Sequence, residues 1–112
     1  MRMWMVNPNI MCRQHLLGEH LELHMFLGTI KKGTSIEGYL KNGLLETHNI
    51  QSRHDQLVQE MIKRGYKHNT PLDCSYNNIG HINIEHNIEV LKSRCTRCCE
   101  RIEEVRKMIY DT

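Results

Sequence analysis

The sequence lacks the features that would place the protein in a membrane or outside the cell. No apolar run approaches the roughly 20 residues that a membrane-spanning helix requires. The first residues also lack the charged and then apolar pattern, ending in a small-residue cleavage site, that marks a secretory signal. We therefore expect an intracellular, cytoplasmic protein that makes no membrane contact.

The chain also lacks a large excess of charge of either sign. Its 15 Lys and Arg residues stand against 13 Asp and Glu residues, for a formal net charge of +2. Any nucleic-acid site must therefore be a local patch rather than a polybasic surface. Repeats and low-complexity tracts are missing, and 39% apolar with 25% charged residues fits one globular domain over residues 1–112.

Cysteine is present, but in an odd number that does not favour a disulfide framework; thiols also stay reduced inside cells. Cys95 and Cys98 form a CxxC motif, whereas a structural zinc site requires four ligands and usually a second pair. Cys12 and Cys74 are isolated from each other in the sequence. Because Cys95 and Cys98 fall on an apolar helix face, we interpret them as core residues, with a metal site as the alternative.

The spacing of apolar residues predicts an all-α domain of three main helices, with an extended lead-in over residues 1–6 and long loops. The first helix is expected to begin at Asn7-Pro8, with Asn as cap and Pro in the first turn, and to close at 31–33. Its apolar positions recur at the helical period: Leu16, Leu23, Leu27 and Ile30.

A second helix is expected to follow Ser52, which forms a capping pair with Asp55, and to end at 63–65. Its apolar stripe consists of Leu57, Val58, Met61 and Ile62. Glycines and turn residues predict loops over 33–50 and 66–80.

The clearest periodicity lies in residues 82–110, where apolar residues alternate steps of four and three. These residues are Ile84, Ile88, Leu91, Cys95, Cys98, Ile102, Val105 and Ile109. The pattern predicts one helix of roughly 28 residues with a narrow apolar seam. We expect the seam to pack on the other helices of a monomer; a dimer through residues 84–109 is the alternative.

The first helix carries an unusual number of ionisable residues over 14–24. His15 and Glu22 are seven residues apart and should share one face, on which Gly18 leaves a bare groove. This face is either solvated surface or a catalytic site. His20 and His24 have a spacing that can bind a metal, although they lack the HExxH order of zinc proteases, and we interpret them as surface residues.

These residues resemble a known family. Gln14-His15-Leu16, with Glu19 and Glu22-Leu23 on the same helix, is similar to the first helix of the pyrimidine-dimer DNA glycosylases, the endonuclease V type known from phages. The segment 53–66, which ends in Lys-Arg-Gly-Tyr, resembles a later helix of that family.

The chain begins Met-Arg-Met-Trp. It is more similar still to short cellular members of the family, which begin with Met, Arg, then Met, Ile or Leu, and then Trp. The resemblance covers about residues 1–72. It implies a DNA-repair N-glycosylase with abasic-site lyase activity, which acts on double-stranded DNA with damaged or abasic sites and needs no metal or cofactor.

The resemblance also implies a role for individual residues. Family members use the α-amine of the first residue as nucleophile, which corresponds to Met1, and an acid on the first helix, which corresponds to Glu22. Arg2 and His15 align with supporting residues. Initiator methionine is normally removed only before a small residue, so Arg2 predicts that Met1 is retained. An α-amine, with a reference pKa of about 7.7–8.0, is partly neutral at physiological pH and can form a Schiff base.

Two departures concern the lesion. Leu21 and Met25 stand where the family has arginines, and the chain ends without the family's aromatic and basic tail. Phosphate contacts must come from other cations, and we predict DNA-binding roles for Arg13, Lys31, Lys32, Arg53 and Lys67. The alternatives are a non-enzymatic DNA-binding or helix-mediated interaction protein and a small His/Cys metal-binding protein.

Overall fold

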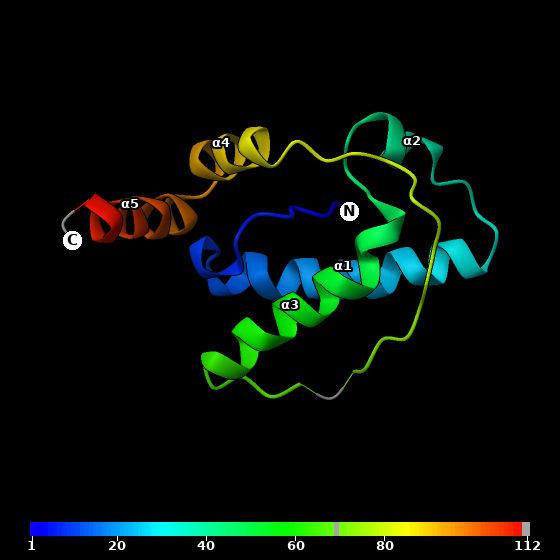
Figure 1. Ribbon diagram of the computed structural model, residues 1–112, viewed down its shortest axis with the longest axis horizontal. Coiled ribbons are helices and arrows are strands. Elements are labelled where there is room, and N and C mark those ends of the chain that lie inside the picture. The colour runs from blue at the N-terminus through cyan, green and yellow to red at the C-terminus, as the bar shows by residue number, and fades with distance from the viewer. Residues whose placement is uncertain (69, 111–112) are drawn as a thin grey trace.

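A computed structural model describes residues 1–68 and 70–110, and these residues form an all-helical fold without strands (Figure 1). The elements in chain order are the 3-10 helix η1 (Pro8–Ile10), α1 (Arg13–Lys31), α2 (Glu37–Lys41), the 3-10 helix η2 (Thr47–Asn49), α3 (Ile50–Lys63), α4 (Ile84–Arg94) and α5 (Thr96–Tyr110). The all-α prediction is confirmed. Nowhere in the described part of the chain is a helix both long and apolar enough to cross a membrane.

Helix α1 runs through the centre of the molecule, and it begins later than predicted. Asn7 and Pro8 start the short helix η1, in which the Asn7 side chain accepts the N–H of Asn9. The cap of α1 is Cys12. The predicted end is confirmed, since α1 stops at Lys31 and Gly33 follows with a φ of 73°. The predicted inward face is also confirmed, with Leu16, Leu23 and Leu27 buried and Ile30 packed against the core.

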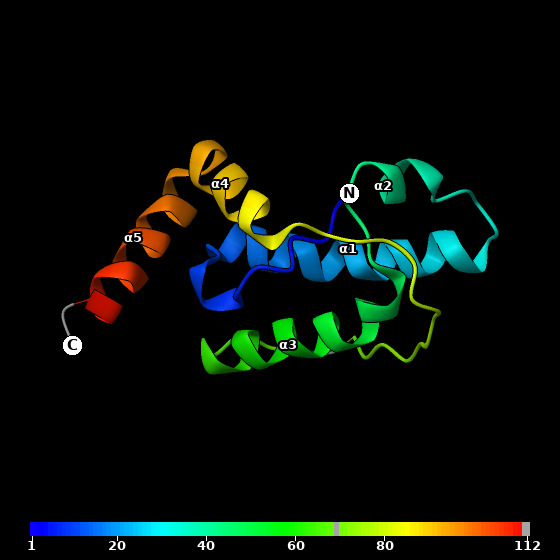
Figure 2. The same cartoon turned by 45° about the horizontal axis from the view of Figure 1, so that its top comes forward.

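Helix α3 packs against α1, as both views illustrate (Figures 1 and 2). It begins at Ile50 rather than after Ser52, whose hydroxyl donates instead to the carbonyl of Asn49. Leu57 and Met61 are buried as predicted, whereas Ile62 is 57% exposed. The core-facing stripe extends instead to two polar residues, Arg53 and His54, which the apolar pattern could not include.

The predicted C-terminal helix is wrong in one respect: it is broken into α4 and α5 at Cys95 (Figure 2). Cys95 has an extended backbone, with φ −131° and ψ 111°. Neither Pro nor Gly marks the break, so the apolar period continues through it undisturbed. The change of direction lets α5 pack against η1.

The apolar seam packs within the chain. Leu91, Cys98 and Ile102 are buried, and Ile88 and Val105 pack against the core, whereas Ile84 is 44% exposed. The side chain of Ile109 lies outside the described residues. The middle of the seam is therefore covered by the chain itself, as expected for packing within a monomer, and the oligomeric state stays a prediction.

The extended lead-in is confirmed, whereas the loops differ from the prediction in detail. Residues 1–6 run along α1 and bury Met3, Trp4 and Val6, and the Met3 N–H donates to the Leu44 carbonyl at 2.8 Å. The predicted loop 33–50 contains α2, which is too short to show a period. In the second loop, Gly80 has a φ of 93°, and a Cβ there would overlap the carbonyl oxygen of Leu45.

Candidate active site

A cavity of about 360 Å³ lies between the start of the chain and the first half of α1. The lead-in contributes Met1, Arg2 and Trp4, and α1 contributes Gln14, His15, Gly18, Glu19 and Glu22. The prediction that His15 and Glu22 share one helix face with the bare Gly18 is confirmed, because all three line this cavity. A Cβ at Gly18 would meet no heavy atom within 4 Å, so the absent side chain leaves open space.

Glu22 is held directly against the start of the chain. Its Oε2 accepts the backbone N–H of Arg2 at 3.2 Å. Only the Cα and the carbonyl carbon of Met1 separate this N–H from the α-amino nitrogen. Met1 and Glu22 are both half-buried. The fold therefore brings the α-amine and a carboxylate to one cavity, although they are distant in the sequence.

Arg2 is fixed by contacts on both sides of its guanidinium group. Its Cζ lies 3.9 Å from the centre of the Trp4 ring, in a cation–π arrangement. Its Nη2 donates to Oδ1 of Asn87 on α4 at 2.6 Å. Burial and then Arg94 lower the pKa of Arg2, whereas Glu22 and Glu19 raise it. Its Nε is buried and has no hydrogen-bond partner among the described residues.

Asn87 supports this region, a role that the sequence analysis did not predict. It is 2% exposed, and its amide donates to the Trp4 carbonyl at 2.8 Å while its oxygen accepts from Arg2. Asn87 is a polar residue between the apolar positions Ile84, Ile88 and Leu91, and polar residues are mostly exposed. Only the fold reveals that it fastens α4 to the lead-in.

His15 lies between the cavity and a group of sulfur atoms. Its ring meets Trp4 edge-on, with ring centres 5.8 Å apart, and its Nδ1 lies 3.2 Å from Sγ of Cys12. Burial lowers the pKa of His15, and the negative charge of Glu22 offsets part of this effect. The neutral imidazole is therefore favoured near pH 7.

Beneath the cavity, Glu19 and Arg53 form a buried ion pair. Arg53 Nε and Nη2 donate to the two Glu19 oxygens at 2.6 and 2.8 Å, and Nη1 donates to the Val6 carbonyl at 2.6 Å. Both residues are 1% exposed. This burial contradicts the predicted phosphate contact of Arg53, because its guanidinium is covered and already paired. Arg53 is buried because it neutralises the buried carboxylate of Glu19.

The remaining predicted DNA contacts are exposed but do not line the cavity. Arg13 stacks near the ring of Tyr66, with 5.2 Å from Cζ to the ring centre. Lys31 and Lys32 lie at the other end of α1, about 27 Å along the helix from Arg13 at 1.5 Å per residue. Lys67 follows α3 in the second loop. Their roles in DNA binding stay predictions.

The interpretation of His20 as a surface residue is wrong, because it is buried in a histidine cluster formed by α1, α3 and the loop after α3. The group whose ring nitrogens come within 4.8 Å of one another is His20, His54 and His68, and His24 packs at its edge. His20 and His68 share a hydrogen bond of 3.0 Å between their Nε2 atoms. Burial and then the neighbouring histidines lower the pKa of His20 to about 4, which keeps the cluster's centre neutral.

Comparison with known families decides the class of the protein. The sequence model of a family described as pyrimidine dimer DNA glycosylase matches residues 1–73. The chain belongs to this family. No curated protein and no solved structure matches it.

Membership of the pyrimidine dimer DNA glycosylases implies DNA glycosylase activity with damaged DNA as the substrate. Every residue that lines the cavity lies inside the matched segment. Asn87 and the α4–α5 pair lie outside it. The candidate cavity is thus formed by the family segment and supported, through Asn87, by a part of the chain outside that segment.

Proposed function

We propose that this glycosylase also acts as an abasic-site lyase, with the α-amine of Met1 as nucleophile and Glu22 as the acid–base residue. The observation that carries the proposal is the hydrogen bond from the Arg2 N–H to the Glu22 carboxylate, in a cavity that Met1 also lines. The proposal requires Met1 to carry a free α-amino group.

The reaction starts with attack of the neutral amine on C1′ of the sugar. The C1′–N bond to the base breaks, and the base leaves with the bonding electrons and takes up a proton. The amine nitrogen then loses a proton, the C1′–O4′ bond breaks and O4′ takes up a proton, so that the opened sugar is joined to Met1 as a Schiff base. At an abasic site the amine condenses with the C1′ aldehyde instead, and water is the leaving group. Removal of a proton from C2′ then breaks the C3′–O bond and cleaves the strand. Water finally hydrolyses the Schiff base and restores the amine.

Glu22 serves both stages. Its carboxylate stabilises the positive charge that develops on the sugar and then on the Schiff base, and it moves protons during elimination. The chemistry requires no metal. Arg2 is a positioning residue, because its backbone holds Glu22 while its side chain is anchored on Trp4 and Asn87. The neutral His15 completes the polar lining of the cavity.

The DNA must be deformed to bring C1′ to Met1. Extrusion of a nucleotide costs a few kcal/mol, and the cost is least at a damaged or abasic site. Arg13, Lys31, Lys32 and Lys67 are the proposed phosphate contacts on cellular double-stranded DNA. Leu21 and Met25, 60% and 47% exposed, offer apolar side chains where the family has arginines. We therefore base the proposal on abasic-site chemistry and leave the excised lesion open.

Borohydride trapping tests the proposal, since reduction of the Schiff base links protein and DNA covalently. Tag-free protein, whose intact mass confirms retention of Met1, should be trapped on abasic-site DNA without added divalent cation. Glu22→Gln should slow trapping by about 10²–10⁴-fold. Glu37→Gln on α2, an exposed carboxylate away from the cavity, should trap at the original rate.

Blocking the amine provides the complementary arm. A chain extended by two residues ahead of Met1 should fold and bind DNA but form no adduct. An adduct that persists in the extended chain, with its new α-amine also blocked by acetylation, would assign the nucleophile to a lysine instead. DNA binding without any adduct from the free N-terminus would favour the non-enzymatic DNA-binding alternative.

A further inference from the structure

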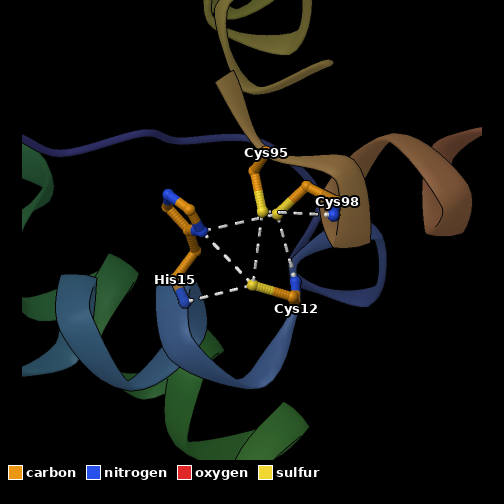
Figure 3. Close-up of side chains that lie close together, drawn as sticks. All are labelled: Cys12, His15, Cys95 and Cys98. Carbon is orange, nitrogen blue, oxygen red and sulfur yellow. Dashed lines mark hydrogen bonds between the residues drawn. The ribbon is translucent and has the colours of Figure 1, made fainter. Parts of the chain in front are cut away.

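Three cysteines and one histidine from opposite parts of the chain converge next to the candidate active site. Cys12 caps α1, His15 lies in its first turn, Cys95 occupies the break between α4 and α5, and Cys98 lies in the first turn of α5. Their three Sγ atoms and the His15 Nδ1 all lie within 4.8 Å of one another. Figure 3 shows the four side chains pointing toward a common centre.

The spacing fits a single tetrahedral ion. Bonds of about 2.3 Å for Zn–S and about 2.0–2.1 Å for Zn–N place two sulfur ligands about 3.8 Å apart, and a sulfur and a nitrogen about 3.6 Å apart. The Sγ atoms of Cys12 and Cys95 are 3.8 Å apart. The His15 Nδ1 lies 3.2 Å from Sγ of Cys12 and 3.6 Å from Sγ of Cys98.

The local backbone is arranged to stabilise sulfur in the charged form. The N–H groups of Cys12, His15 and Cys98 point at Sγ of Cys98, Cys12 and Cys95, at 3.2, 3.5 and 3.5 Å respectively (Figure 3). Helices α1 and α5 start in the same way. A cysteine precedes the helix, and the residue three positions later, His15 or Cys98, donates its N–H to the sulfur of that cysteine. Helix N-termini favour negative charge, which lowers the energy of a thiolate there.

We propose that Cys12, His15, Cys95 and Cys98 bind one Zn²⁺ in a closed, structural site. Binding releases the thiol protons of the three cysteines, which leaves three thiolates and a neutral imidazole around the ion. All four positions are filled by the protein, so the ion has no place for water or substrate and no part in the lyase chemistry.

The proposal takes up the alternative interpretation of the CxxC motif, as a metal site, in place of core packing alone. Cys12 and Cys98 are indeed buried among apolar residues, but core packing does not account for the His15 nitrogen or for the converging sulfurs. The missing second pair is Cys12 with His15, which the fold supplies from the start of α1. A Cys12–Cys95 disulfide would require about 2.05 Å between sulfurs rather than 3.8 Å.

The ion would fasten α5 to the family segment. Two ligands lie inside the matched residues 1–73 and two lie beyond them. The same junction includes Arg101 of α5, whose Nε donates to the Asn9 carbonyl at 3.0 Å. Because the ligand His15 also lines the cavity, zinc would fix one of its walls. This inference does not depend on the lyase chemistry proposed above.

Elemental analysis of tag-free protein, purified under reducing conditions, tests the site directly. We expect about one zinc per chain and, after exchange for Co²⁺, the visible absorption bands of a tetrahedral thiolate site. Cys95→Ser should lower the zinc content at least about tenfold. The matched controls are Cys99→Ser and Cys74→Ser, since both residues are half-buried and neither belongs to the cluster; both should keep the metal.

A second measurement uses the unaltered protein, so it tests the site even if Cys95→Ser does not fold. Alkylation should modify Cys74 and Cys99 first and leave Cys12, Cys95 and Cys98 protected until a strong chelator is added. Zinc far below one equivalent in fully reduced protein would overturn the proposal. So would stoichiometric zinc that persists in Cys95→Ser, because the ion would then lie elsewhere, with the cluster of His20, His54 and His68 as the next place to examine.

Discussion

Residues 1–73 and the α4–α5 pair are held in the molecule by different interactions. The first region has its own apolar core between α1 and α3, with a buried ion pair of Glu19 and Arg53 inside it. The α4–α5 pair adds Leu91, Cys98 and Ile102 to that core, with Ile88 and Val105 packed at its edge, and it is also attached through polar groups on Asn87 and Arg101.

The difference separates chemistry from support. All the groups proposed to react come from the first region, where the lead-in meets one face of α1. The second region does not line the cavity but contacts two residues that do: Asn87 accepts a hydrogen bond from Arg2, and Sγ of Cys98 lies beside the His15 ring. Substitutions in the first region should therefore affect folding or the reaction itself. Substitutions in the second region should affect how Arg2 and His15 are positioned in the cavity.

The largest effect is expected from Arg53→Ala, which strands the buried Glu19 carboxylate. Loss of one partner of a buried pair typically costs about 3–5 kcal/mol in the free energy of unfolding. Urea unfolding, followed by circular dichroism, measures this cost. Lys63→Ala, at the exposed end of the same helix, should change stability by less than about 0.5 kcal/mol.

Two further outcomes would separate burial from DNA contact at Arg53. Glu19→Leu combined with Arg53→Met removes both charges and should recover much of the lost stability. A stable Arg53→Ala protein with weaker, less salt-dependent DNA binding would instead restore the phosphate contact that the burial argues against.

The histidine cluster predicts that the first region weakens in mild acid. The folded pKa of His20 is about 4, below the ordinary value of 6.5, so the unfolded chain binds more protons between these values. Stability is thus fully present above pH 6.5 and is lost as pH falls toward 4, by roughly 2 kcal/mol at pH 5. His24, His54 and His68 face the ring and oppose its protonation.

Unfolding by urea at pH 7 and pH 5 measures this loss, and two variants identify its source. His20→Gln should remove most of the difference between the two pH values. His86→Gln, an exposed histidine on α4, should leave it unchanged. If the difference in stability between pH 7 and pH 5 persists in His20→Gln, its source would be the proposed zinc ligands, because protons compete with zinc for the cysteine sulfurs.

The sequence predicted the first region better than the second for physical reasons. Helices α1 and α3 each correspond to one apolar period, whereas the period of residues 84–109 runs through two helices. Helix α2 spans only Glu37–Lys41, too few residues for a period. The break at Cys95 is a change in one residue's backbone, and no local residue type announces it.

The part of the candidate site that lies on one helix could be predicted from the spacing of its residues. His15, Gly18 and Glu22 share a face because of their separation in one helix, and the family motif led to Met1. The long-range contacts were missed. A charged Arg53 or a polar Asn87 has the sequence signature of a surface residue, and only the position of Glu19 or Trp4 in space gives either a buried partner.

A smaller effect is expected from Asn87→Ala, which tests whether α4 supports the cavity. The substitution leaves the buried Trp4 carbonyl and the Arg2 guanidinium without their partner, for a cost of about 1–3 kcal/mol. Asn83→Ala, which removes the cap of α4, should cost about 1 kcal/mol without touching Arg2. If α4 positions Arg2, only Asn87→Ala should also slow borohydride trapping; equal trapping rates in the two variants would reduce α4 to a stabilising attachment.

The smallest change in stability, and the sharpest test of the cavity, is expected from Gly18→Ala. Alanine is favoured over glycine in a helix by up to about 1 kcal/mol, and a Cβ at this position meets no atom of the protein. Stability should rise, yet trapping on abasic DNA should slow, since the methyl group enters the space where the sugar must approach Met1. Gly28→Ala is the matched control, because it lies in the same helix with equal room and away from the cavity. It should raise the melting temperature without changing the trapping rate, and a Gly18→Ala protein with an unchanged rate would show that the sugar does not enter along this face of α1.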